Sequence, residues 1–275
     1  MNVNTPDLAS KYESISSIYL QNRWHKEAFN LIDFEINDHV LDVGCGTGRE
    51  CRYISPFVNS VIGIDKSRGM IEQARKTNTA LHIQYLEDAA ETFFDHHSDW
   101  SERFNKILCL SVLHYCKDEN RILNNIFKCL KPGGSFVIGF PSKFQLHGEG
   151  SSYGETADNW VRNHERWGVF LKDYDYQIIP RENSDAFITT MKSLGFKVQY
   201  VKVHKGKYVL WKEKLIKAQL QCLFDPITQI PFQQQDEFLD DVYKWLYDVT
   251  TKREDGYLQG ELGRFEYLIA LATKE

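Results

Sequence analysis

The sequence lacks the features of a metal-binding, membrane-spanning or secreted protein. Its six cysteines are scattered and form no C-x-x-C pair or Cys/His cluster, so we expect free buried thiols and no metal site. No run of about eighteen apolar residues that could cross a bilayer is present. The first ten residues, MNVNTPDLAS, have neither the basic flank nor the apolar core of a secretion signal. These absences predict a cytoplasmic protein.

The sequence also has fewer basic than acidic residues. The 33 Lys and Arg residues are outnumbered by 38 Asp and Glu residues, which gives a net charge of −5 at pH 7. Nucleic-acid-binding proteins usually carry a broad basic surface, and no recognition module of that kind is visible. We therefore expect a small-molecule partner and no nucleic acid. The sequence leaves the oligomeric state open.

What the chain does contain is a regular alternation of strand-like and helix-like segments in its first half. Short apolar runs predict strands at 39–43, 60–65, 81–86, 105–111 and 135–140. Helical patterns lie between them, at 49–55, at 119–130 and from an N-cap at Ser67 to residue 74. Strands separated by helices in this rhythm form right-handed crossovers. We predict an α/β fold with a doubly wound, mostly parallel sheet.

The second half is less regular. Residues 142–182 are polar and aromatic without a clear period, and two amphipathic helical stretches are expected near 211–223 and 235–250. A helix at 185–194 and strands at 196–204 and 264–274 complete the pattern. We expect a single domain over 1–275, in which 142–182 and 207–260 are insertions that form a lid. Aromatic side chains of the insertions are candidates to line an apolar acceptor pocket, although most are expected to form core. These are Tyr153, Trp160, Trp167, Phe170, Tyr174, Tyr176, Trp211, Phe224, Phe232 and Trp245.

The most informative motif is the run Leu41-Asp42-Val43-Gly44-Cys45-Gly46-Thr47-Gly48. A strand, a glycine-rich turn and a helix begin many nucleotide-binding sheets. The spacing is G-x-G-x-G, whereas loops that cradle a pyrophosphate have G-x-G-x-x-G. A carboxylate at Asp42 would repel a pyrophosphate but can accept a hydrogen bond from an ammonium group. The motif therefore predicts S-adenosylmethionine, which carries a ribose and an amino acid but no phosphate.

Two further carboxylates follow the next strands in register. Asp65 ends the second strand, where an acid can accept hydrogen bonds from both ribose hydroxyls, although nicotinamide enzymes share this feature. Asp88 follows the third strand and is the candidate acceptor for the adenine amino group. Arg23 is a candidate partner for the carboxylate of the methionine part. The remaining expected cofactor contacts are Gly44, Cys45, Gly46, Lys66, Met70, Ala89, Leu110 and Ser111.

Together these features resemble the class I methyltransferase superfamily over about residues 35–140. The resemblance implies a seven-stranded Rossmann-like sheet and a cofactor-binding core at 35–140. It also implies S-adenosyl-L-methionine as methyl donor, S-adenosyl-L-homocysteine as product, and no metal.

A narrower resemblance extends over nearly the whole chain and is carried by short motifs. These motifs are Leu20-Gln21-Asn22-Arg23, Leu113-His114-Tyr115, Asn125-Ile126-Phe127, Phe238-Leu239-Asp240-Asp241 and Ala270-Leu271-Ala272. They look like the insect juvenile hormone acid O-methyltransferases, within a group of small-acid methyltransferases that includes the trans-aconitate type.

In that family a Gln of the N-terminal helix and a Trp after the fourth strand hold the substrate carboxylate. Gln21 matches the first position, whereas Tyr115 stands where the Trp would be. A tyrosine can still donate a hydrogen bond, through its hydroxyl group. The resemblance thus implies an acid with an apolar body as methyl acceptor, and the departure at Tyr115 leaves the identity of that acid open.

The candidate acceptor residues suit this chemistry. A carboxylic acid with a pKa of about 4 is ionised at pH 7, so it needs no general base. Neutral donors such as Gln21 and Tyr115 can align the anion without neutralising it. His114 is a third donor or, for an amine or hydroxyl acceptor, a general base. A cofactor-binding protein without transferase activity is a further alternative.

Overall fold

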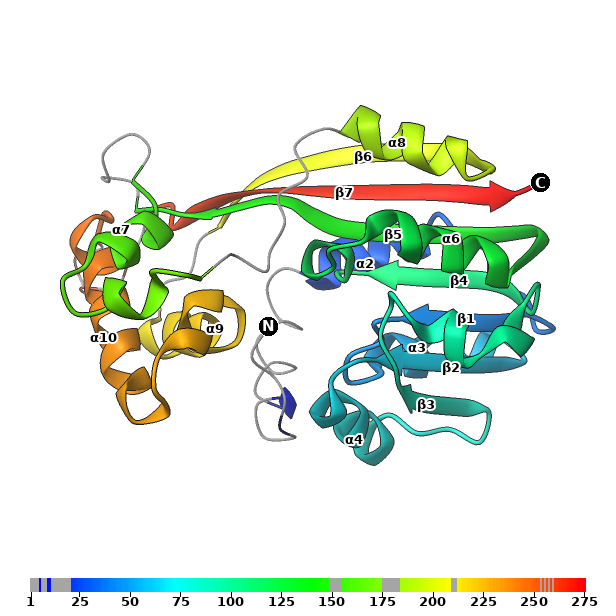
Figure 1. Ribbon diagram of the computed structural model, residues 1–275, viewed down its shortest axis with the longest axis horizontal. Helices are drawn as coiled ribbons and strands as arrows, with labels where there is room; N and C mark the ends of the chain where they lie inside the picture. The colour runs from blue at the N-terminus through cyan, green and yellow to red at the C-terminus, as the bar shows by residue number, and fades with distance from the viewer. Residues whose placement is uncertain are drawn as a thin grey trace. The chain divides into compact units, whose positions relative to one another are not determined.

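A computed structural model describes residues 5, 9–10, 21–148, 155–174, 184–208, 212–252, 254, 256, 258 and 260–275. Within these residues, seven strands form one sheet in the order β3-β2-β1-β4-β5-β7-β6 (Figure 1). The strands are β1 (His39–Val43), β2 (Ser60–Asp65), β3 (Ile83–Glu87), β4 (Phe104–Leu110), β5 (Leu130–Leu146), β6 (Phe196–Tyr208) and β7 (Gly263–Lys274). The helices are α2 (Gln21–Phe29), α3 (Arg49–Ile54), α4 (Arg68–Thr77), α5 (Phe93–His96), α6 (Glu119–Cys129), α7 (Ala157–Asn163), α8 (Ser184–Ser193), α9 (Glu213–Leu223) and α10 (Gln235–Asp248).

The register of the sheet brings the carboxyl ends of five strands to one edge. β3, β2, β1, β4 and β5 pair in parallel, so Asp42 lies opposite Gly63, and Asp65 lies opposite Glu87. The arrowhead of β7 points opposite to those of β1 and β4, which makes β7 the antiparallel strand (Figure 1). Parallel strands share one carboxyl edge, and ligands of open α/β sheets bind there. The predicted doubly wound, seven-stranded, mostly parallel sheet is confirmed.

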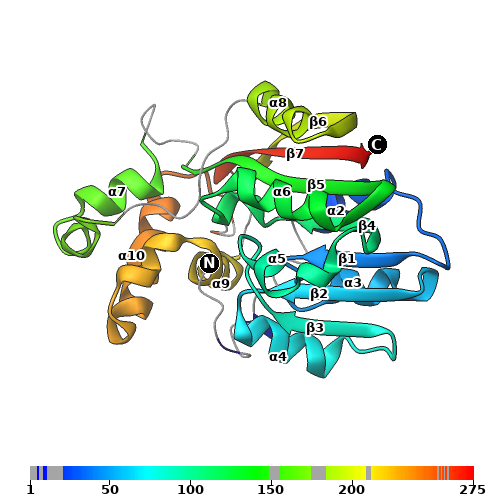
Figure 2. The same cartoon turned by 45° about the vertical axis from the view of Figure 1, so that its right-hand side comes forward.

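Chain contacts divide the protein into two compact units. The core unit comprises Val3–Phe140, Arg181–Val203 and Tyr267–Glu275; the helical unit comprises Pro141–Pro180, His204–Glu266 and the first two residues. The strands β5, β6 and β7 each contribute residues to both units. The organisation of the whole chain as one domain stays a prediction. In the core unit, β3 and α4 lie at the edge of the sheet opposite β6 and α8 (Figure 2).

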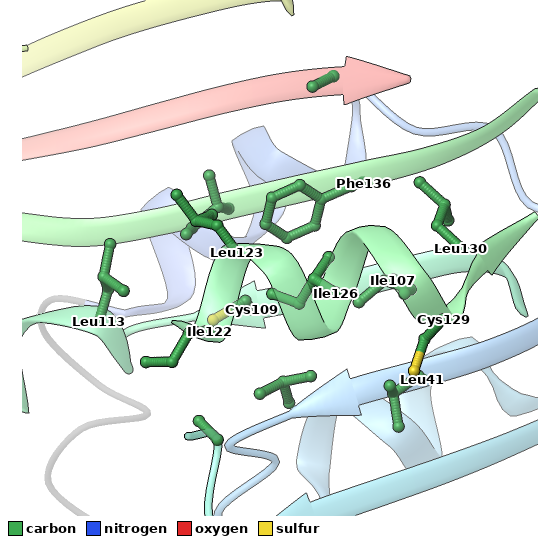
Figure 3. Close-up of a cluster of buried hydrophobic side chains, with 14 of the residues drawn as sticks. Leu41, Ile107, Cys109, Leu113, Ile122, Leu123, Ile126, Cys129, Leu130 and Phe136 are labelled. Carbon is green, nitrogen blue, oxygen red and sulfur yellow. The ribbon is translucent and has the colours of Figure 1, made fainter. Parts of the chain in front are cut away.

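The core unit is built around the alternating side chains of β1. Leu41 points into a large apolar cluster with Ile122 and Ile126 of α6 and Phe136 of β5 (Figure 3). The neighbouring Asp42 points the other way, because successive strand residues face opposite sides of a sheet. Its carboxyl group meets Cys51 of α3 at 3.2 Å. Helices therefore cover both faces of the sheet, as a doubly wound fold requires.

Short side chains define where the helices of the core unit begin. The Ser67 hydroxyl accepts a hydrogen bond from the Met70 amide at 3.3 Å, which confirms Ser67 as the N-cap of α4. In the same way the Asp118 carboxylate accepts from the Arg121 amide at 2.9 Å and starts α6. Both helices are thus placed directly after loops that leave the carboxyl edge of the sheet.

The main difference from the predicted boundaries lies in β5. The strand begins at Leu130, five residues before the expected 135–140 segment, and ends later, at Leu146. Its register against β4 jumps from Phe104–Leu130 to Lys106–Ser135. The Pro-Gly-Gly sequence after Lys131 thus forms a bulge within the strand rather than a separate turn before it, because Pro132 has no amide hydrogen to donate to the ladder.

The helical unit has an aromatic core of its own. Trp167 is fully buried, and its indole nitrogen donates to the Asp241 carboxylate at 2.9 Å. Trp160 stacks on Trp245 at 5.6 Å between ring centroids. Trp160, Trp167 and Trp245, three of the candidates for lining an acceptor pocket, thus form part of the core of the helical unit. Phe232, in contrast, is 80% exposed. The candidates Tyr153, Tyr176 and Trp211 lie outside the described residues.

No helix in the part of the chain that the structure describes is long and apolar enough to cross a membrane.

Replacing Ile126 by Ala should destabilise the protein by about 2–5 kcal/mol, because the side chain is fully buried between α6 and the sheet. Urea unfolding followed by circular dichroism measures the change. Asn120→Ala, on the exposed side of the same helix, is the matched control and should change stability by less than about 0.5 kcal/mol. Equal losses for both variants would contradict the assigned core.

Candidate functional site

The loop between β1 and α3 can be formed only with glycine at two positions. Gly44 and Gly48 have φ angles of 75° and 77°, in the left-handed region that other residues rarely adopt. A Cβ atom on Gly44 would overlap the Val112 side chain, and one on Gly48 would overlap the Tyr85 ring. The loop after β1 is therefore packed directly against the loop after β4. No atom lies within 4 Å of a Cβ placed on Gly46, so the turn is open at that residue.

Hydrogen bonds fix this glycine turn to the end of β2. The amides of Gly44 and Cys45 both donate to the Ile64 carbonyl oxygen, at 2.7 and 2.9 Å. The Gly46 amide donates to the Asp65 carboxylate at 3.0 Å. The glycine turn thus has a defined shape before any ligand binds, because the amides of its first three residues are all hydrogen-bonded to the end of β2.

Asp65 has the position expected for a group that binds a diol. Its two carboxylate oxygens accept from the amides of Gly46 and Ser67, at 3.0 and 2.8 Å. Burial raises the pKa of Asp65 above its ordinary value, while these two amide hydrogen bonds and the nearby Lys66 act in the opposite direction. Each oxygen has two lone pairs, so each can still accept one hydroxyl hydrogen. The geometry fits the ribose role, which stays a prediction.

Asp42 is a buried carboxyl group with an unusual proton affinity. Its pKa is raised to about 7, chiefly by burial and then by the negative charge of Glu50. The hydrogen bond from the Cys51 thiol lowers the pKa, and Asp65 raises it slightly. A cationic ligand would favour the ionised form of such a group. The expected contact of Asp42 with the ammonium group of the cofactor is consistent with this and stays a prediction.

Asp88, the candidate for the adenine contact, already has protein partners. Its carboxylate accepts from the Ala89 amide at 2.8 Å and lies 3.0 Å from His96 and 3.3 Å from His97. The Asp88 amide in turn donates to the carbonyl oxygen of Asp65 at 3.0 Å, which joins the ends of β2 and β3. The loop after β3 therefore lies next to the ribose candidate.

The loop after β4 contains a residue with strained backbone geometry. Ser111 has a φ angle of 60°, in the left-handed region, although it is not a glycine. Its amide donates to the Gly139 carbonyl oxygen at 2.6 Å, and its hydroxyl group lies 2.9 Å from the Tyr267 hydroxyl. Leu110, just before it, is buried. Strain of this kind persists only where the surroundings fix it.

A histidine that the sequence did not single out contacts this loop. His25 of α2 is buried, its Nε2 lies 3.2 Å from the Ser111 hydroxyl oxygen, and its Nδ1 lies 2.9 Å from Glu50. Burial raises the pKa of Glu50, but its interactions with His25 and Arg49 outweigh burial and lower the pKa to about 2. No local sequence pattern predicts this group, because its members come from α2, α3 and the loop after β4.

The candidate acceptor residues are only partly described. His114 and Tyr115 lie in a short helical turn (Leu113–Tyr115) after β4, with their rings 4.0 Å apart. His114 is buried and Tyr115 is half-buried. Gln21 and Arg23 belong to α2, but their side chains lie outside the described part of the chain. The roles of all four residues stay predictions.

Two other expected cofactor contacts lie near the start of α4. Lys66 is exposed in the loop after β2, and Met70 is fully buried within α4.

The cysteines confirm the expectation of free buried thiols. All six are free and buried. Burial raises the pKa of Cys45 to about 11, so this thiol of the glycine turn is protonated at neutral pH and is not a nucleophile. Among the described residues, no group of three or more His, Cys, Asp or Glu side chains could hold a metal ion.

Comparison with known families supports a methyltransferase domain in the core unit. Residues 41–138 match the sequence profile of a family described as "Methyltransferase domain". This segment contains the glycine turn, Asp65, Asp88 and Ser111, so the family match covers the loops brought together at the carboxyl edge.

A similar curated protein carries a methyltransferase name, and similar solved structures share the fold. The ubiquinone biosynthesis O-methyltransferase of Proteus mirabilis is 30% identical over 97 residues, which are 34% of this chain and 38% of that protein. A methyltransferase candidate from Bacillus halodurans has a similar fold, with a TM-score of 0.58 and 17% identity over 90% of this chain and 97% of that one.

Phosphoethanolamine N-methyltransferase 2 of Haemonchus contortus, solved with phosphomonomethylethanolamine and S-adenosylhomocysteine, has a TM-score of 0.57 at 17% identity; the match covers 99% of this chain and 59% of that one. At this identity the two structures establish the fold alone, an open, mostly parallel α/β sheet with helices on both faces. The chain spans only 37–41% of the length of three curated relatives it matches.

Asp42→Asn should make the protein more stable at pH 8 but weaken cofactor binding. The folded-state pKa of about 7 lies above the ordinary 3.8, so the contribution of Asp42 to stability is fully present below about pH 4 and is lost as the pH rises to about 7. The Asn variant lacks this fall, and its Tm should exceed the wild-type value by about 5 °C or more at pH 8. Calorimetry between pH 4 and pH 8 measures the difference.

The exposed Asp33→Asn variant is the control and should follow the wild-type pH profile. A parallel titration with S-adenosylhomocysteine measures binding. An Asp42→Asn protein that binds as tightly as wild type would remove Asp42 from the cofactor site.

Proposed function

We propose that the protein is an S-adenosylmethionine-dependent methyltransferase that methylates a small molecule at a carboxylate oxygen. The observation that carries the cofactor assignment is the glycine turn, which is fixed between Ile64, Asp65 and Val112. The carboxyl groups of the buried Asp42 and the half-buried Asp65 border it. Two carboxylates suit a ligand with an ammonium group and a diol, and they disfavour a pyrophosphate. The family match over residues 41–138 supports the same assignment.

When bound, S-adenosylmethionine supplies an electrophilic methyl group on a sulfonium centre. The chain itself needs to hold an acceptor oxygen in line with that group and to exclude water. Such positioning can supply about 7–11 kcal/mol of rate enhancement. A carboxylate acceptor is already ionised at neutral pH, so no side chain has to take a proton.

The carboxylate assignment rests on the residues after β4 and in α2. In sequence, Gln21 and the Leu113-His114-Tyr115 turn resemble the segments with which the juvenile hormone acid O-methyltransferases hold their substrate, and this resemblance supports the same role here. Gln21 and Tyr115 are neutral donors, and a neutral donor orients an anion while leaving its nucleophilic oxygen largely uncompensated. We infer an acid with an apolar body as the acceptor, within the small-acid group of methyltransferases.

An amine or hydroxyl acceptor is the second candidate, favoured by one feature of the turn after β4. His114 is buried against the Tyr115 ring, an arrangement that can hold an imidazole in a fixed orientation. A fixed imidazole can serve as the general base that amine and hydroxyl acceptors require. The O- and N-methyltransferase names of the similar proteins fit this alternative as well.

Incubation with methyl-labelled S-adenosylmethionine and panels of fatty, terpenoid and tricarboxylic acids should give a labelled ester. Mild base should release the label as methanol, because esters hydrolyse where methyl ethers and methylamines do not. Scintillation counting before and after base treatment measures the product. Labelled product that survives base would overturn the carboxylate assignment, and cofactor binding without turnover on any acceptor would support a non-catalytic role.

Two substitutions distinguish the acceptor classes. Gln21→Ala should raise the KM for a carboxylate acceptor about tenfold or more, because it removes a neutral donor to the anion. His114→Ala should leave a carboxylate enzyme with most of its kcat but reduce an amine or hydroxyl enzyme by about 100-fold. Steady-state kinetics and titration with S-adenosylhomocysteine measure the two effects. If Gln21→Ala weakened cofactor binding instead, Gln21 would belong to the cofactor site.

A further inference from the structure

His25 joins the two loops that form the candidate cofactor site. On one side its Nδ1 contacts Glu50, which lies in α3 two residues after Gly48. On the other side its Nε2 contacts the hydroxyl group of Ser111, directly after β4. The distances are 2.9 and 3.2 Å. One buried side chain of α2 therefore connects the helix that follows the glycine turn to the loop that packs against this turn.

The direction of these hydrogen bonds follows from the chemistry of Glu50. Its pKa of about 2 keeps the carboxylate ionised, so it can only accept, and His25 must donate from Nδ1. On the other side of the ring, Nε2 lies 3.2 Å from the Ser111 hydroxyl oxygen, which in turn lies 2.9 Å from the Tyr267 hydroxyl oxygen. Tyr267, Ser111, His25 and Glu50 thus form one continuous chain of polar contacts.

This chain acts on the residue with strained geometry. Ser111 has a left-handed backbone, and the next residue, Val112, is packed against Gly44 of the glycine turn. The Ser111 hydroxyl is held from two sides, by His25 and by Tyr267. Tyr267 is itself fixed by stacking on Trp24, the neighbour of His25, with 5.7 Å between ring centroids. A change in Ser111 would therefore be transmitted directly to the glycine turn.

We propose that His25, oriented by Glu50, is a positioning residue for the cofactor. It holds Ser111 in the left-handed conformation and thereby keeps the loop after β4 and the glycine turn at the spacing that the methionine part of S-adenosylmethionine requires. The inference rests on the proposed function. His25 acts through Ser111, and its contribution is to preorganise the site, so its loss weakens binding without removing a direct ligand contact.

The two nitrogens of His25 can be tested separately. In His25→Asn the side-chain amide lies near the position of Nδ1, so the Glu50 contact is kept and the Ser111 contact is lost. In His25→Gln the amide reaches the position of Nε2, so the Ser111 contact is kept. Isothermal titration with S-adenosylhomocysteine should give a Kd about 10- to 100-fold higher for His25→Asn. For His25→Gln the Kd should lie within about threefold of the wild-type value.

A second measurement shows whether His25 acts through Ser111. In a Ser111→Ala background, His25→Asn should change the Kd by no more than about twofold, because the contact between the two residues is already absent. The Ser111 amide donates to the Gly139 carbonyl oxygen. In the ligand-free protein, the hydrogen exchange of this amide should be faster in His25→Asn than in wild type. This readout does not depend on any ligand.

His39→Asn is the matched control. His39 also contacts a serine hydroxyl, that of Ser60 at 2.7 Å, but at the start of β1 and therefore at the opposite edge of the sheet. This variant should leave both the Kd and the exchange rate of Ser111 unchanged.

The possible outcomes separate the inference from the proposed function. A wild-type protein that binds neither S-adenosylmethionine nor S-adenosylhomocysteine overturns the proposed function, and the inference with it. If the wild-type protein binds S-adenosylhomocysteine and the His25→Asn variant binds it with the same Kd, the inference alone is overturned. Equal losses of affinity in the Asn and Gln variants also overturn it, because a general structural defect would not distinguish the two nitrogens.

Discussion

The contact between Gly44 and Val112 fixes the distance between the loops after β1 and β4, and the candidate site depends on it. A side chain at Gly44 would force these loops apart. The amides of Gly44 and Cys45 could then no longer both donate to the Ile64 carbonyl oxygen at the end of β2. The parallel register places the loop ends at one edge of the sheet, but it does not set their spacing to within an ångström. Close packing of a glycine against a branched side chain supplies that precision.

The charges around this contact show how differently buried acids behave. Asp42 is buried and Glu50 is half-buried in the same part of the core unit, yet the pKa of Asp42 is raised to about 7 and that of Glu50 is lowered to about 2. The difference lies in their partners, a neutral thiol for Asp42 and an imidazole with a guanidinium group for Glu50. The site therefore holds one permanently charged acid beside one whose charge depends on pH and on what is bound.

The sequence predicted the core unit well, because its signals are local. The glycine spacing, the Ser67 cap and the apolar period of α6 each act within a few residues, and the structure confirms the strand and helices that they predict. The bulge in β5 escaped prediction, because a Pro-Gly-Gly sequence is equally typical of a turn. The His25 group escaped it for a different reason: its contacts join residues 25, 86 and 156 positions apart, and only the fold brings them together.

The place of Tyr267 in the chain has a consequence for how the protein is made. Ser111 receives one of its two hydroxyl contacts from a residue 156 positions later in the sequence. Contacts between residues so far apart in sequence form late, because closing a long loop is entropically unfavourable. During synthesis the glycine turn and its acids can fold early, but the loop after β4 reaches its final form only when β7 has left the ribosome and joined the sheet. A shortened chain that ends before β7 would retain the sequence motif without the complete site.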